Sequence, residues 1–280
     1  MQDGLKYSWG SLIFYFGYIA GTYPVSLLAQ RYSTRIVITV ICILWSVVVL
    51  STPACRNYGD FLANRFLLGL VEAGVSPIFM LVVGFWYTHE EQVSRSSWWY
   101  SFSGGSLLVS PLINYGMGHI QGGSMQPWQY MYFIAGSVTT IWGVALWWLF
   151  PDTPQNARGF TEEERALLLE RVRGNNAGAE SKTFKRYQIV EALKDYQMWG
   201  ICIISMMACT GAGAVTVFAP IVFNGMGFSV FESLLLNLPI GALAFILILG
   251  SGYIGRFVPN SRFRIISASC IPVILGCALV

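Results

Sequence analysis

The amino-acid sequence predicts an all-α membrane protein that crosses a lipid bilayer several times. Of its 280 residues, 55% are hydrophobic and only 11% are charged, whereas a soluble domain carries roughly a quarter charged residues. The charges separate apolar runs of about 20 residues, which is the length that a helix needs to cross the hydrocarbon core of a membrane. These runs lack the strict alternation of barrel strands, so we expect helices.

Taken in order, the apolar runs predict seven complete spans and an eighth that reaches the end of the chain. The stretch from Ser96 to Phe150 holds no Asp, Glu, Lys or Arg and is too long for one crossing, so we place a turn in its Gly- and Pro-containing segment 121–127. A second turn is expected at 224–227. The expected spans are Tyr7–Gln30, Ile36–Cys55, Phe61–Thr88, Ser96–His119, Trp128–Phe150, Tyr196–Phe223, Ser233–Gly255 and Ile265–Val280.

The basic residues predict the orientation of these spans. The loops at 31–35, 89–95, 151–195 and 256–264 hold 14 of the 17 lysines and arginines, so we expect them on the cytoplasmic side and the N-terminus outside. An outside N-terminus without a signal sequence indicates that a preceding helix is missing. We expect three regions, an N-terminal helical bundle (1–150), a cytoplasmic central loop (151–195) and a partial C-terminal bundle (196–280).

The central loop is expected to contain one short amphipathic helix at the membrane surface. Thr161 and Glu164 have the spacing of a capping box, which predicts a helix that continues through Arg173. A flexible stretch is expected to follow near residues 174–180.

Two charged residues lie well inside a predicted span. Arg65 and Glu72 are seven residues apart, almost two helical turns, so both project from one face about 10 Å apart along the axis. A charge at the bilayer centre costs a few kcal/mol, so neither is expected to face lipid. Gly69 between them lets a neighbouring helix or a ligand approach closely. An interhelical ion pair that only fixes packing is one interpretation, and a functional pair is the other.

The functional interpretation gives the two residues separate roles. Arg65 carries a permanent charge on a planar fork that suits a carboxylate, whereas Glu72, removed from water, is able to carry a proton. An ionised Glu72 would neutralise Arg65, and a protonated Glu72 would free Arg65 to hold an anion. The proton and the anion would therefore move across the membrane in the same direction. Tyr18 is a further candidate for substrate binding, with Tyr15 beside it, although ordinary packing also explains both.

The sequence lacks the patterns of several other functional classes. No nucleotide-binding signature or nucleophile–base motif is present, so we expect no catalytic residue, no enzyme activity and no cofactor. Six cysteines without CxxC spacing, together with His89 and His119 at span ends, do not indicate a metal site. A net charge of +3 without a basic stripe argues against a nucleic-acid partner.

Several segments resemble major facilitator transporters of the anion:cation symporter group. The segment Arg65–Gly74 resembles the fourth helix of that group, and the closest likeness is its fungal allantoate permease branch, which includes nicotinate, pantothenate and biotin carriers. The further matching segments are Tyr23-Pro24, Leu27-Leu28, Trp86-Tyr87 with Glu90 and Arg95, Pro127-Trp128-Gln129, Phe133-Ile134 with Gly136, Phe150-Pro151-Asp152-Thr153-Pro154, Thr161–Arg165, and Ala192–Asp195 with Trp199.

The resemblance implies a partial major facilitator fold, helices two to nine of a twelve-helix, two-bundle architecture that lacks the first and the last three helices. It also implies that Arg65 binds the substrate anion and that Glu72 couples the proton. We therefore expect a monomeric, multi-pass plasma-membrane protein that cotransports a proton and a small organic anion, such as allantoate or a vitamin acid, by alternating access. A truncated, non-transporting fragment or regulator and a seven-helix receptor remain as alternatives.

Overall fold

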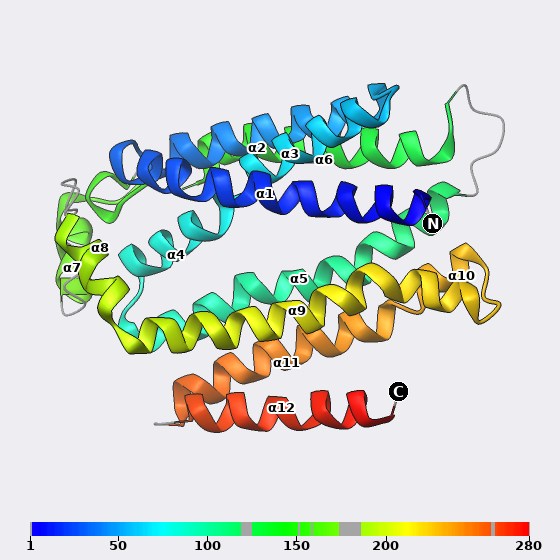
Figure 1. The fold of residues 1–280 in the computed structure, drawn as a ribbon. Coiled ribbons are helices and arrows are strands. Elements are labelled where there is room, and N and C mark those ends of the chain that lie inside the picture. Colours follow the sequence, from blue (N-terminus) through cyan, green and yellow to red (C-terminus); the bar gives the residue numbers. More distant parts are fainter. Residues whose placement is uncertain are drawn as a thin grey trace.

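A computed structural model describes residues 2–118, 125–150, 152–157, 159–173, 186–258 and 261–279. Within these ranges every regular element is a helix, which confirms the expected all-α class. Long helices lie side by side, and the short helices α7 and α8 lie together at one end of the molecule (Figure 1).

The long helices follow the predicted spans in order. Two of the spans are divided, the third into α3 and α4 and the seventh into α10 and α11. The bounds are α1 Gln2–Arg31, α2 Thr34–Ser51, α3 Tyr58–Glu72, α4 Val75–Trp86, α5 His89–Gly118, α6 Pro127–Leu149, α7 Glu162–Arg173, α8 Arg186–Lys194, α9 Tyr196–Gly225, α10 Val230–Leu235, α11 Leu238–Phe257 and α12 Arg262–Leu279, with short 3-10 turns at Thr52–Ala54 and Pro154–Asn156.

Five segments of the described chain are long and apolar enough to cross a membrane, namely Ser8–Arg31, Thr34–Ala54, Tyr58–Trp86, Pro127–Leu149 and Leu238–Phe257. The helix α5 is as long as α1 but less apolar because it is rich in serine. Several of these hydroxyls, including those of Ser101, Ser103 and Ser106, donate to backbone carbonyls three residues earlier at 2.7 Å. Such bonds satisfy hydroxyl groups inside lipid, so α5 remains compatible with a crossing.

The third predicted span bends at its middle. Between α3 and α4, Ala73 and Gly74 form a turn, yet both keep right-handed helical dihedral angles, so the segment changes direction without reversing. A β-carbon at position 74 would overlap the side chain of Val25 in α1. The glycine therefore allows α1 to pass close to the bend, and Glu72 becomes the last residue of α3.

Glycines also bring α1 and α3 into backbone contact. A β-carbon on Gly17 or Gly21 of α1 would overlap the carbonyl of Phe66 or Leu70, and one on Gly69 would overlap the carbonyl of Phe14. This arrangement of small residues four apart is a common way for membrane helices to pack. It confirms the close approach that the sequence predicted at Gly69.

Two further helix pairs organise the rest of the molecule. The helix α2 lies along α6, where Gly136 and Gly143 face Leu50 and Cys42. The helix α5 lies along α11, where Gly104 and Gly241 face each other. Buried residues of α1, α2, α3, α4 and α6 form one core, namely Val25, Ala29, Val37, Ile38, Ile41, Cys42, Val71, Ile78 and Leu146.

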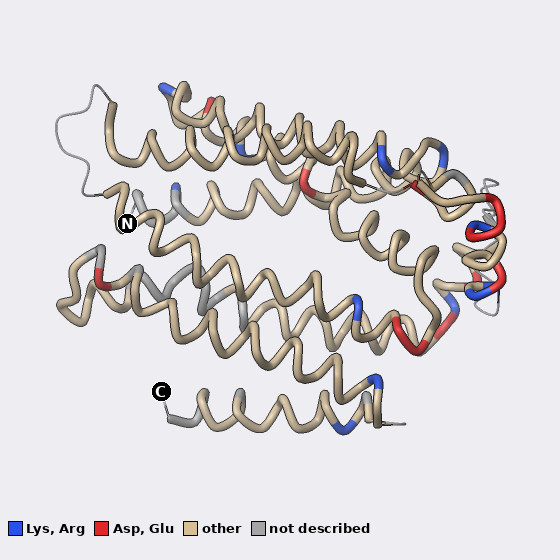
Figure 2. The backbone as a smooth tube through the Cα atoms, turned by 180° about the vertical axis from the view of Figure 1, so that it is seen from behind, with Lys and Arg blue, Asp and Glu red and all other residues tan. Residues whose placement is uncertain are grey.

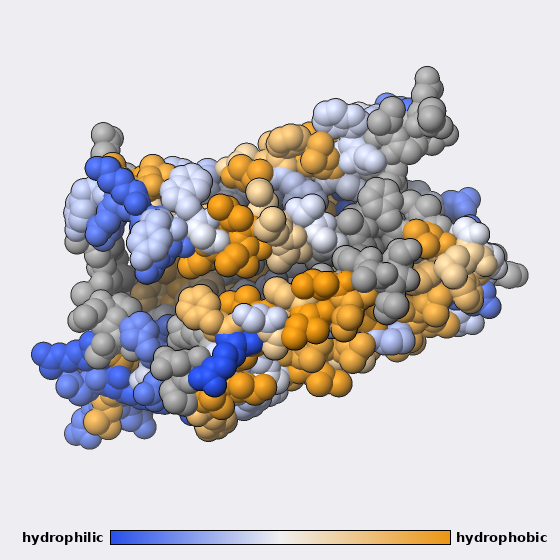
Figure 3. Space-filling view, turned by 60° about the horizontal axis from the view of Figure 1, so that its bottom comes forward, coloured by the Kyte–Doolittle hydropathy of each residue, from blue (hydrophilic) through white to orange (hydrophobic). Residues whose placement is uncertain are grey.

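Charged residues gather at the end of the molecule that carries α7 and α8, while the long helices are largely free of charge (Figure 2). Figure 3 shows hydrophobic residues along the flanks of these helices and hydrophilic residues toward the same end. This distribution is typical of helices that cross a bilayer, because lipid accepts apolar side chains and water accepts the charges.

The helix predicted in the central loop is confirmed with its capping box. The Thr161 amide donates to Glu164 Oε2 at 2.8 Å, and the Glu164 amide donates to Thr161 Oγ1 at 3.3 Å. The turn predicted at 224–227 is also present, and Gly227 adopts a φ of 95° that favours glycine. The turn predicted at 121–127 lies largely outside the described residues, and His119 and the stretch 174–180 lie wholly outside them.

Candidate functional site

A cavity of about 470 Å³ lies between α1 and α3 and contains both of the charged residues predicted from the sequence. Arg65 and Glu72 line it from α3 and are both half-buried. The full lining is Gly10, Ser11, Phe14 and Tyr15 of α1 and Phe61, Arg65, Leu68 and Glu72 of α3.

The spacing of the α3 residues explains why they share this cavity. Phe61, Arg65, Leu68 and Glu72 follow one another at intervals of four, three and four residues, which is one face of a helix. On the opposite wall, a β-carbon at Gly10 would lie 3.0 Å from the Phe61 ring. The glycine thus leaves room for this aromatic ring beside α1.

Arg65 is held by aromatic residues. Its Nη2 donates a hydrogen bond of 2.8 Å to the hydroxyl of Tyr132, which comes from α6. Its guanidinium carbon lies 4.8 Å from the centre of the Phe61 ring, a cation–π distance. Within the described part of the chain, no carboxylate pairs with Arg65. Its positive charge is therefore not cancelled by any carboxylate that the structure describes.

Glu72 makes no hydrogen bond or ion pair with any described residue, and it shares the cavity with Arg65 without contacting it. Among the described residues, neither Arg65 nor Glu72 forms the interhelical ion pair that would only fix packing. What the structure brings together is one cation and one carboxyl group on the same wall of one cavity.

The two candidate tyrosines of α1, Tyr15 and Tyr18, lie differently. Tyr15 lines the cavity, whereas Tyr18, the candidate predicted from the sequence, is not among its described lining residues. The backbone of Tyr18 faces Gly69 at the closest approach of α1 and α3, and its ring lies 6.3 Å from that of Phe14. This placement supports the packing interpretation of Tyr18.

Sequence reasoning missed two polar residues near Arg65. Tyr132 was not distinguished from the other aromatic residues of its apolar helix. Asn64 is 7% exposed. Its side-chain Nδ2 donates to the Val48 carbonyl at 3.0 Å and to Ser51 Oγ at 2.9 Å. Its Oδ1 accepts a hydrogen bond of 3.1 Å from Thr52 Oγ1. An amide next to Arg65 inside an apolar helix was the signal available in the sequence.

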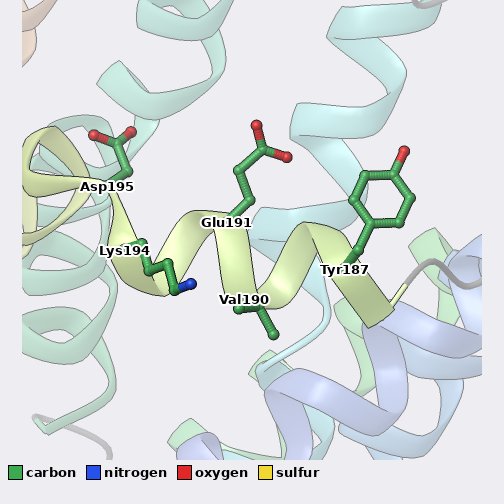
Figure 4. Close-up of a pocket in the computed structure, with 5 residues that line it drawn as sticks. All are labelled: Tyr187, Val190, Glu191, Lys194 and Asp195. Carbon is green, nitrogen blue, oxygen red and sulfur yellow. The ribbon is translucent and has the colours of Figure 1, made fainter.

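A second hollow, of about 670 Å³, lies on the surface beside α8. In Figure 4, Tyr187, Glu191 and Asp195 project to one side of the helix, and Val190 and Lys194 project to the other. Because all five side chains are exposed and do not converge, this hollow lacks the features of a specific small-molecule site.

Known proteins resemble this chain along its whole length. Residues 2–280 match the profile of the Major Facilitator Superfamily. The chain is 35% identical to an uncharacterized transporter of Schizosaccharomyces pombe, over 99% of this chain and 52% of that protein. A thiamine pathway transporter of Saccharomyces cerevisiae is 30% identical, over 98% of this chain and 52% of that protein. The allantoate permease of the same yeast is 32% identical, over 86% of this chain and 46% of that protein. The chain thus spans about half the length of the curated relatives it matches.

Proposed function

Because this chain belongs to the Major Facilitator Superfamily, we propose that it acts as a secondary active transporter that moves a small organic anion together with a proton. The observation that carries the proposal is the cavity between α1 and α3, in which an arginine that pairs with no described carboxylate and a carboxyl group share one wall. The relatives bear the names of transporters and a permease, which favours transport over an enzyme or a seven-helix receptor.

Arg65 is the proposed anion-binding residue. Its guanidinium has five N–H donors, and a carboxylate is able to accept two of them side by side. One hydrogen bond goes to Tyr132, and no Arg65 nitrogen is buried without a partner, so donors remain open to the cavity. The similarity to an allantoate permease supports a carboxylate substrate, such as allantoate or a vitamin acid, and a place in the allantoate permease branch.

Glu72 is the proposed proton-coupling residue. It lines the same cavity as Arg65 but has no partner among the described residues, so a proton would bind there without breaking a described ion pair. An ionised Glu72 repels an incoming anion and attracts the Arg65 guanidinium, whereas a protonated Glu72 does neither. This difference favours entry of the anion and the proton together.

Movement by alternating access follows from the proposed two-bundle organisation. We assign residues 1–150 to one bundle, 196–280 to part of the other and 151–195 to the cytoplasmic loop between them. In such transporters one bundle rocks against the other around a central site. The bend between α3 and α4 lies directly beside Glu72, which supports a link between the site and helix movement. We propose a monomer in the plasma membrane.

The test is uptake of labelled allantoate, nicotinate, pantothenate and biotin by host cells that lack their own carriers and express this chain. We expect uptake of at least one compound to be faster at an external pH of about 5 than at about 7.5. Arg65→Ala should reduce uptake about 100-fold because a bidentate charge-assisted contact is lost. Glu72→Gln should abolish the dependence on pH.

Two matched variants control for loss of charge elsewhere. Arg56→Ala removes an exposed arginine beyond the cavity, and Glu163→Gln removes an exposed carboxylate on α7; both should transport like the wild type. If the chain reaches the membrane and takes up none of the four compounds, or if Glu72→Gln keeps its pH dependence, the proposal is wrong.

A further inference from the structure

We propose that Tyr132 is a positioning residue for the anion site, which holds the Arg65 guanidinium toward the cavity and apart from Glu72. The inference rests on the proposed function, because it assumes that Arg65 receives the anion. Tyr132 lies on α6, beyond the two helices that line the cavity, and is not itself part of the lining.

The contacts of Arg65 come from two directions. The Phe61 ring lies one turn earlier on the same helix, with its centre 4.8 Å from the guanidinium carbon. The Tyr132 hydroxyl accepts a hydrogen bond of 2.8 Å from Nη2, and its ring centre lies 6.0 Å from the guanidinium carbon. Of these two contacts, the second ties Arg65 to a different helix, so Tyr132 is the described residue that fixes the guanidinium relative to the rest of the bundle.

Tyr132 is itself oriented by the start of α6. Trp128, one turn earlier, packs edge-to-face against it with ring centres 6.2 Å apart and an interplanar angle of 82°. The first turn of α6 is closed by reciprocal contacts between Gln126 and Gln129, and Gln129 also donates to the Pro53 carbonyl at 3.5 Å. The hydroxyl of Tyr132 is therefore presented from a fixed helix end.

The chemistry of a tyrosine suits this position. A phenol hydroxyl accepts a hydrogen bond without bringing a negative charge, so Tyr132 orients Arg65 and leaves its positive charge available. A carboxylate in the same place would neutralise Arg65 and compete with the substrate. Without the hydroxyl, the long arginine side chain loses its tie to α6, and its guanidinium becomes free to move along the cavity wall that also carries Glu72.

The proposal predicts a specific defect for Tyr132→Phe, a change that removes one oxygen and keeps the ring. Affinity for the anion should fall about tenfold near neutral pH, as expected for a lost hydrogen bond to a charged group. The loss should be smaller at acid pH, because a protonated Glu72 no longer attracts the released guanidinium. In uptake, KM should rise while the maximal rate changes little.

The experiment measures binding of labelled allantoate, nicotinate, pantothenate and biotin to the purified full chain in lipid nanodiscs, at two pH values. The control is Tyr130→Phe, because Tyr130 lies on the same helix turn, does not line the cavity and makes no hydrogen bond or ring contact with a described residue.

A second measurement needs no substrate. Phenylglyoxal, which modifies arginine, is applied to each protein, and the rate at Arg65 is read by peptide mass spectrometry. We expect this rate to rise several-fold in Tyr132→Phe and not in Tyr130→Phe.

The two measurements separate the two proposals. If the wild type binds none of the four compounds, the proposed function fails, and the labelling rate still decides whether Tyr132 restrains Arg65. A different outcome is that the wild type binds a compound while Tyr132→Phe has the same affinity, pH profile and labelling rate as the wild type. In that case Tyr132 is not a positioning residue, and the proposed function stands. An equal loss of affinity in Tyr130→Phe would also overturn the inference, since it would indicate a general effect of altering α6.

Discussion

At the scale of single residues, Asn64 and Arg65 are neighbours in sequence with different environments. Asn64 is buried among Val48, Ser51 and Thr52, and its side-chain oxygen and nitrogen both have partners. Arg65 is rotated by about 100° around the helix and faces the cavity. The hydrogen bonds of Asn64 thus fix the rotation of α3 and keep Arg65 away from lipid.

Replacing Asn64 should therefore destabilise the protein without removing a cavity residue. Asn64→Leu keeps the branched shape and the number of side-chain heavy atoms but leaves the hydroxyl groups of Ser51 and Thr52 without this partner. We expect a loss of about 1–2 kcal/mol, the range for hydrogen bonds between membrane helices, seen as a lower melting temperature in detergent. Asn114→Leu is the control because Asn114 makes one bond of 3.4 Å on an exposed face. Equal melting temperatures for the two variants would contradict the role of Asn64.

At the scale of helices, α7 of the central loop is attached to the start of α5. Arg171 Nη2 pairs with Glu91 Oε1 at 2.6 Å, and Val172 is only 3% exposed. Nearby, Trp86 at the end of α4 donates to the Asp152 carbonyl at 3.0 Å and packs against Phe160. The loop helix therefore contacts the helical bundle directly, while its position at the membrane surface stays a prediction.

This attachment should weaken in acid. Partial burial raises the pKa of Glu91, but hydrogen bonds from Thr88 and the charge and hydrogen bond of Arg171 outweigh it and hold the pKa below its usual value. A lowered pKa means that the stabilisation is complete above the usual value of about 4.3 and is lost as pH falls through the lower, folded-state value. Because Arg171 is half exposed, the pair contributes less than about 1 kcal/mol.

Hydrogen exchange of α7 measures this effect. At neutral pH, Glu91→Gln should exchange up to about fivefold faster than the wild type, and at about pH 3 the two proteins should agree. Glu170→Gln is the control, since its one ion pair among the described residues is with Arg173 on the same helix. A difference between wild type and Glu91→Gln that persists undiminished in acid would rule out the ionised pair as the attachment.

At the scale of the whole molecule, α5 and α11 join the two parts of the chain that lie on either side of the central loop. Gly104 faces the backbone of α11 near Gly241, and Trp98 Nε1 donates to the Tyr253 hydroxyl at 3.1 Å. The sequence assigned α5 to the N-terminal bundle, and the structure shows that it also packs along α11. In a transporter with two moving bundles, this contact is where their relative position is set.

Adding one methyl group at this contact should separate the two helices. A β-carbon at Gly104 would lie 2.6 Å from the Phe245 amide nitrogen and 2.9 Å from the Gly241 carbonyl oxygen, and backbone atoms do not move aside easily. We expect Gly104→Ala to lose about 1–3 kcal/mol of stability. Gly105→Ala should be nearly neutral, because its β-carbon would meet only the Phe102 and Phe245 rings at 3.5 Å or more. Thermal unfolding of both variants tests this, and equal effects would show that the contact is not tight.

Much of the fold and part of the site were predictable from local patterns. The spans followed from apolar runs, the helix of the central loop from the spacing of Thr161 and Glu164, and the shared face of Arg65 and Glu72 from their separation of seven residues. The bend at Ala73 and Gly74, the lining by Tyr15 in place of Tyr18, and the partners of Arg65 and Asn64 were not predicted. Each of these depends on contact with another helix.

The sequence by itself determined that lipid is the solvent, how the chain divides into helices, and that one cation and one carboxyl group lie on the same helix face, because composition and the 3.6-residue period act within a single segment. The tertiary structure decided which helices touch and which side chains meet. Arg65 and Tyr132 are separated by 67 residues, and they meet because α3 and α6 both pack against α2, which α6 approaches closely at Gly136 and Gly143. Such contacts depend on how several helices fill space together, and no periodicity within one helix records them.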